Sequence, residues 1–219
     1  MVKPLHLTLT NNQLHIDDYP DAVALKRIDT PIARQLQAVT LNQFDLTFCR
    51  DALAEIARLN RSENVTIVEG LWVAAIARYF KCFGGNKSRS QLTARKIFKD
   101  HQGAKSVFTY FQHLRDKHII HDENPFTQAF TGVAINGTEA QDKVADVISL
   151  AINAFTVNDA HLTQFTQLVD VTLNWVSAKR DELHNDLSRE YEQWSRENLL
   201  ALPDIQFTPP GADAVGLKR

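Results

Sequence analysis

The sequence predicts a mainly α protein: an antiparallel helical bundle with a β-hairpin inserted before a long C-terminal helix, and a small hairpin at the N-terminus. Apolar residues recur at helical spacing in four stretches after residue 42, and strand-like alternation is confined to two places. We expect residues 1–40 to hold the first hairpin and loops, 41–200 the bundle with its hairpin at about 126–152, and 201–219 a flexible tail.

The first hairpin is predicted from "LHLTLTNNQLHI", residues 5–16, where apolar and polar residues alternate on both sides of Asn11-Asn12. Residues 17–40 contain Pro20 and Pro31 and show a mixed pattern. We expect loops there, with at most a short helix.

Three helices are predicted next. The first follows Asn42 and has an apolar stripe of Phe44, Phe48, Ala52, Ile56 and Leu59. The second is capped by Ser62 or Asn64 and ends at 84–86, with a stripe of Val65, Val68, Trp72, Ile76, Tyr79 and Phe83. The third begins at 103–106 and stops before Pro125, because the residue before a proline avoids the helical region.

The inserted hairpin is predicted from "FTQAFTGVAIN" and the turn signal Asn136-Gly137. "VADVISLAI" is the returning strand, although so short an apolar run is also compatible with a helix. A helical pattern then runs from Asn158 to about Leu200, with an apolar edge of Leu173, Val176, Leu183, Leu187, Tyr191 and Trp194. A helix of this length would be about 60 Å long, which is longer than one small core needs. The excess length suggests that the helix contacts a partner or a second copy of the chain.

Charge, cysteine content and hydropathy argue against several classes of protein. The net charge of −2 gives no global sign of nucleic-acid binding, so such a role needs a local basic patch. Cys49 and Cys82 have no metal-binding spacing and are expected to be buried thiols in a reducing compartment. The most apolar window, 65–83, contains Glu69, Arg78 and Lys81, so we expect no membrane span and a cytoplasmic protein.

The segment "TYFQHLRDKHIIHDENPF", residues 109–126, concentrates the titratable side chains. On a regular helix, His118 and His121 continue the face of Phe111 and Leu114, and Arg115 lies at its edge. These residues are either structural groups near a helix C-terminus or part of a cleft. A metal site would need His113, which points to the other side, and no HExxH, GxSxG or P-loop pattern accompanies the segment.

Within this segment, "LRDKHIIH" resembles the R-x(4–6)-H motif of the HEPN superfamily, with Arg115 and His121 separated by five residues. In that family a polar residue commonly follows the arginine, and Asp116 fits. The preceding aromatic-rich helix, "LWVAAIARYFKCF", and the following hairpin also fit a branch of bacterial HEPN-like proteins. The resemblance covers residues 42–155 and, less clearly, the last helix.

The resemblance implies a metal-independent endoribonuclease without a cofactor, which acts as a homodimer and leaves a 2′,3′-cyclic phosphate. It assigns the acid–base role to His121, phosphate binding to Arg115 and an orienting role to Asp116. His118 is an accessory candidate, and the alternative for it is a packed, hydrogen-bonded structural histidine. Toxin–antitoxin or phage-defence roles follow by analogy, with RNA as substrate and an antitoxin protein as a candidate partner. The alternative is a non-catalytic HEPN-like module that binds RNA or protein.

Basic residues gather just upstream of the motif. Residues 78–105 contain eight lysines and arginines against one acid, Asp100. Such a segment is either a solvated surface or a phosphate track. The candidate RNA-binding residues are Arg89, Arg95, Lys96 and Lys99. The stretch 181–204 is acidic, so it would repel RNA or meet the basic segment of a second copy.

Overall fold

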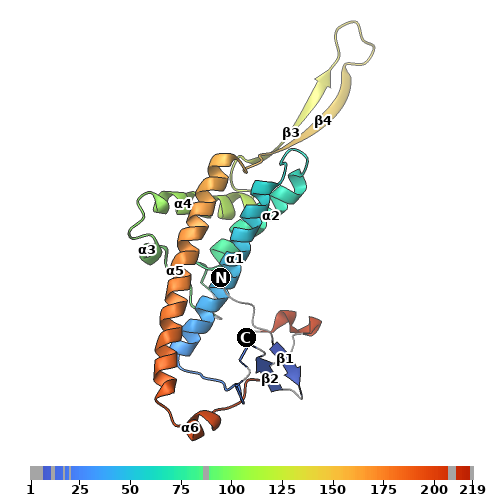
Figure 1. The fold of residues 1–219 in the computed structure, drawn as a ribbon. Coiled ribbons are helices and arrows are strands. Elements are labelled where there is room, and N and C mark those ends of the chain that lie inside the picture. Colours follow the sequence, from blue (N-terminus) through green and yellow to red (C-terminus); the bar gives the residue numbers. More distant parts are fainter. Residues whose placement is uncertain are drawn as a thin grey trace. The chain divides into compact units, whose positions relative to one another are not determined.

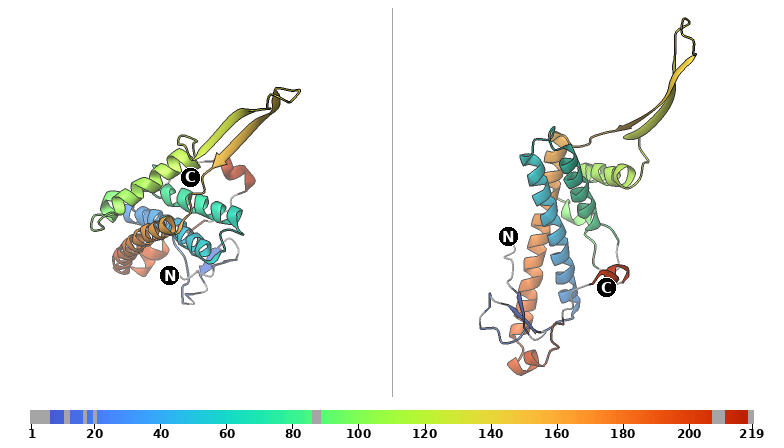
Figure 2. Two further views of the ribbon diagram at one scale, coloured as in Figure 1. Left: turned by 90° about the horizontal axis from the view of Figure 1, so that it is seen from above. Right: turned by 90° about the vertical axis from the view of Figure 1, so that its right-hand side faces the viewer.

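A computed structural model describes residues 7–10, 13–16, 18–19, 21–85, 89–206 and 211–217. It is mainly helical, which confirms the mainly α class. Figures 1 and 2 show the elements, coloured from blue at the N-terminus to red at the C-terminus. Contacts divide the chain into two compact units, the first of residues 1–41, 85–90 and 176–219 and the second of residues 42–84 and 91–175. None of the described helices is both long and apolar enough to cross a membrane.

The first unit contains the N-terminal hairpin. Strands β1 (Leu7–Thr10) and β2 (Gln13–Ile16) pair antiparallel, as predicted, while the turn residues Asn11 and Asn12 lie outside the described residues. A second antiparallel contact joins Lys26 to Asp204, with Arg27 N donating to Pro203 O at 2.7 Å. This contact anchors the start of the segment that we predicted as a flexible tail. Within that segment, residues 207–210 and 218–219 are not described.

Helix α1 (Pro31–Arg58) begins eleven residues earlier than predicted. Thr30 and Pro31 explain the start: Ala33 N donates to Thr30 Oγ1 at 3.2 Å, and proline fits the first helical position because its missing N–H has no partner there. The predicted apolar stripe is confirmed at Ala52 and Ile56 but wrong at Phe44, which is 68% exposed. Leu46, Cys49 and Leu53 complete the buried face.

The core of the second unit lies around helix α2 (Val65–Lys81), whose predicted stripe is confirmed at Val68, Trp72, Ile76 and Tyr79. Its neighbours are helix α4 (Ala104–Leu114) and the part of helix α5 (Asp159–Glu192) that belongs to this unit. Two side chains of α2 make hydrogen bonds to other parts of this core. Trp72 Nε1 donates to Thr156 Oγ1 at 3.1 Å, and the Tyr79 hydroxyl lies 2.9 Å from Thr172 Oγ1.

Cys49 and Cys82 are buried free thiols, as predicted. The Cys49 Sγ lies 3.2 Å from the carbonyl oxygen of Ala75, and burial raises the pKa of the Cys49 thiol far above its ordinary value. The folded protein therefore keeps this proton at a pH where the unfolded chain loses it.

This difference predicts a stability loss in alkali. Below about pH 8.5 both states hold the proton; above it only the unfolded state ionises, so the free energy of unfolding should fall by about 1.4 kcal/mol per pH unit from Cys49. Urea denaturation between pH 8 and pH 10 measures the slope. Cys49→Ala should remove this part of the slope, and an unchanged slope in that variant would contradict the assignment.

The inserted hairpin is confirmed as strands β3 (Thr127–Ile135) and β4 (Val144–Asn153). They pair antiparallel from Thr127 opposite Asn153 to Ile135 opposite Val144, with a register shift between Ala134 and Ile135. The pair forms a two-stranded ribbon (Figure 1). The alternative of a helix over 144–152 is thereby excluded.

The last helix is shorter than predicted. Helix α5 ends at Glu192 and is followed by a separate helix α6 (Arg196–Leu200). Ser195 causes the break, because its hydroxyl accepts from Asn198 N at 3.2 Å and caps the new helix. Trp194, predicted on the apolar edge, lies in this break and is exposed. Two further short helices, α3 (Ala94–Ile97) and η2 (Ala212–Gly216), were not predicted.

Candidate functional site

The segment from Arg115 to His121 begins with an irregular helical turn. Helix α4 continues directly into a π-helical turn, η1 (Arg115–Ile119), in which Ile120 N donates to Arg115 O at 2.9 Å. The helix therefore ends before His121. His121 is exposed, so its predicted placement on the buried Phe111 face was wrong, whereas His118 is half-buried. A π turn holds more residues than an α turn, so it rotates the side chains that follow it. Such turns occur frequently at functional sites.

Arg115 is held on two sides within the second unit. Its guanidinium carbon lies 5.1 Å from the ring centroid of Phe80 on α2, and its Nε donates to Asp116 Oδ1 at 2.6 Å. The Nη2 group pairs with the same carboxylate oxygen. The arginine side chain remains 25% exposed. The ring and the carboxylate fix the direction of the guanidinium before any ligand binds.

The three histidines of the segment have different surroundings. His118 is half-buried, with its ring edge against Phe126 at 5.3 Å, and its buried Nδ1 has no hydrogen-bond partner among the described residues. His113 on α4 and His121 beyond η1 are both exposed. His121 is therefore accessible to a large substrate, whereas His118 is packed.

The basic segment upstream is only partly free for a ligand. Lys81 pairs with the buried Asp45 at 3.3 Å, and the Arg78 guanidinium lies 3.8 Å over the ring of Phe48. Lys87, which the prediction also included, lies outside the described residues. Arg89 is half-buried and belongs to the first unit.

The remaining candidates, Arg95, Lys96 and Lys99, are exposed on or just after α3 in the second unit. Aromatic contacts connect α3 with the motif. The ring centroid of Phe98, which follows α3, lies 5.8 Å from Phe108 on α4, and Phe108 lies 5.1 Å from Phe80, over which Arg115 packs. Phe80 and Phe98 are buried, so they support the surface and do not offer rings for base stacking.

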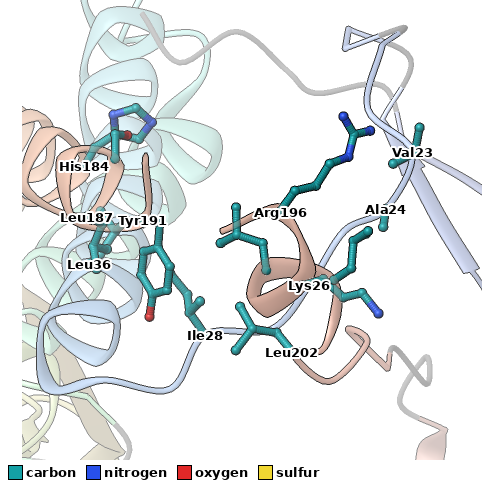
Figure 3. A pocket seen from close by; sticks show the side chains of 13 residues that line it. Val23, Ala24, Lys26, Ile28, Leu36, His184, Leu187, Tyr191, Arg196 and Leu202 are labelled. Carbon is teal, nitrogen blue, oxygen red and sulfur yellow. The ribbon is translucent and has the colours of Figure 1, made fainter. Parts of the chain in front are cut away.

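A separate cavity of about 470 Å³ lies in the first unit (Figure 3). Its walls are mainly apolar, and they come from residues 23–28, α1, the end of α5, and α6. Lys26 and Arg196 bring positive charge to it, but Lys26 Nζ is paired with Asp204 Oδ1 at 2.8 Å. No local pattern could predict this cavity, because its walls come from segments that are distant in the sequence.

No three His, Cys, Asp or Glu side chains among the described residues gather closely enough to hold a metal ion. Of the predicted site residues, the structure brings Arg115 and Asp116 together. It adds the contact of Arg115 with Phe80, which the motif alone did not indicate.

Comparisons with protein-family models, with curated proteins and with solved structures found no match to this chain.

Proposed function

We propose that this chain is a metal-independent endoribonuclease of HEPN type. The observation that carries the proposal is the π turn Arg115–Ile119, which holds Arg115 between Phe80 and Asp116. The exposed Ile120 and His121 follow this turn directly. The exposed cations on and just after α3 belong to the same unit, and their neighbour Phe98 belongs to the same aromatic cluster as Phe80. An oriented cation, an accessible imidazole and a nearby basic surface are what RNA cleavage needs.

The chemistry uses the nucleophile of RNA itself. His121 takes the proton of a 2′-OH, the 2′ oxygen attacks phosphorus, and the bond from phosphorus to the 5′ oxygen breaks. The leaving 5′ oxygen then takes a proton, for which His118 or the His121 of a second copy is the candidate donor. Arg115 stabilises the phosphorane oxygens through the side of its guanidinium that Asp116 does not occupy.

A cellular role as a cytoplasmic toxin or phage-defence effector, with an antitoxin protein as partner, belongs to the same proposal. The second candidate is a non-catalytic module that binds RNA or protein. The pairing of Arg115 with Asp116 favours it, because a neutralised arginine attracts phosphate less strongly. Under this candidate, RNA binds through Arg95, Lys96 and Lys99 without being cut.

RNA incubated with the full chain in excess chelator tests the proposal. We expect cleavage that chelation does not stop, with products ending in 2′,3′-cyclic phosphate, and loss of that cleavage in both Arg115→Ala and His121→Ala. Several structured and unstructured RNAs should be used. RNA that is bound but not cut, equally by wild type and both variants, would favour the binding module.

A further inference from the structure

The β3–β4 ribbon is rich in apolar residues, and both of its faces are exposed. Every residue of β4, and every residue of β3 except Ala134, is exposed. The large side chains include Phe130 at 52%, Ile148 at 44%, Leu150 at 59% and Ile152 at 57% exposure. A lone two-stranded ribbon is marginally stable in water, and contiguous apolar surface of this kind marks an interaction site.

The register places the largest of these side chains on one face. Residues two apart on a strand share a face, so Phe130 lies beside Gly132, with Leu150 opposite Phe130 and Ile148 opposite Gly132. Ile152 extends the same face at the base of the ribbon. We call this surface the Phe130 face. On the opposite face, the side chains between Phe130 and Gly132 along the strand are small and polar, because Thr131 lies opposite Ser149 there.

The Phe130 face has a projection next to a hollow. Phe130 is large, while a Cβ built on Gly132 would meet no atom within 4 Å, so the space above this glycine is open. The next residue on this face, Ala134, is also small. A two-fold axis between Phe130 and Gly132 would place each phenyl ring in the hollow of an identical ribbon. Such an isologous fit needs no second kind of surface.

We propose that the Phe130 face packs on the same face of a second copy of this chain, with Phe130 of each copy over Gly132 of the other. Asp146 is the single charged residue of the two strands. It lies on the Phe130 face, opposite Ala134 and two residues from Ile148, so the rest of that face brings no charge to the contact and offers no pairing for a charged partner. The proposal does not depend on RNA cleavage.

The area agrees with a reversible dimer. Four large side chains that are about half exposed, together with their small neighbours, present roughly 500 Å². Two copies would therefore bury about 1,000 Å² in total, which is the lower bound for a specific interface. The interface should dissociate on dilution, and the shape of the contact should matter more than its extent.

Sedimentation velocity of the full chain over a concentration series tests the proposal. We expect the wild type to change from monomer to dimer with concentration. Phe130→Ala removes the projection and Gly132→Val fills the hollow with a residue that suits a strand, so each should weaken dimerisation at least tenfold. Thr131→Val is the matched control, because it lies between them on the opposite face and should leave the dimer unchanged. Circular dichroism of each variant checks that the fold is kept.

A cross-linking experiment checks the arrangement itself. Phe130→Cys protein mixed with Gly132→Cys protein should couple through a short bismaleimide more efficiently than either protein alone. A wild type that stays monomeric at all concentrations, or a dimer that Gly132→Val does not weaken, would overturn the proposal. Monomers that float with phosphatidylcholine vesicles would assign the ribbon to a lipid surface and would overturn it as well.

Discussion

Replacing Trp72 with alanine is expected to lower the free energy of unfolding by about 3–5 kcal/mol. Trp72 is 1% exposed, and its ring meets Phe111 at 5.8 Å and Phe165 at 5.4 Å, both edge-on. The substitution removes both aromatic contacts, opens a cavity that rigid helices cannot close, and leaves Thr156 Oγ1 without its indole donor. Loss on this scale is a large fraction of the stability of a single domain.

Urea denaturation followed by circular dichroism measures this effect. The matched control is Phe44→Ala on α1, because that aromatic side chain is 68% exposed and its removal should change stability by less than about 0.5 kcal/mol. Equal losses in both variants would mean that the predicted aromatic stripe of α1 is buried after all. Trp72→Phe should recover part of the loss, since it restores a ring but not the hydrogen bond.

Replacing His121 with alanine is expected to lower the rate of RNA cleavage by about 10²- to 10⁴-fold, if His121 carries the general base of the proposed reaction. His121 is exposed and lies beyond the end of η1, so its removal breaks no packing and should leave stability unchanged. The expected result is therefore a loss of rate with an unchanged denaturation curve.

The control for this prediction is His113→Ala. His113 is a second exposed histidine, on α4, and the proposed reaction gives it no part. Single-turnover cleavage of one labelled RNA by wild type and both variants provides the comparison. Equal rates in wild type and His121→Ala would remove His121 from the mechanism, and equal losses in both variants would point to a general effect of surface charge.

Much of the fold could be predicted because it depends on neighbours in sequence. Alternation around turn residues predicted both hairpins, and the stripe through Val68, Trp72 and Ile76 predicted the buried face of α2. The start of α1 was missed although Thr30-Pro31 is a local signal, because the proline was interpreted as a loop residue. Ser195 was likewise a local signal for the break after α5.

The candidate site was harder to predict. The spacing of Arg115 and His121 could be read from the sequence, but a helical wheel assumes regular winding, and the π turn at 115–119 breaks that assumption. The support that Phe80 gives to Arg115 joins residues 35 positions apart, so no local pattern could indicate it.

The sequence by itself determined the helical class, the two hairpins and the burial of both cysteines, because periodicity and turn residues act over a few positions. The tertiary structure alone decided which face of α1 is buried, where α4 changes its winding, and that the apolar β3–β4 ribbon stays exposed. The physical reason is the same in each case. Several faces of an element can be apolar enough for burial, and only the surfaces available to pack against it select one.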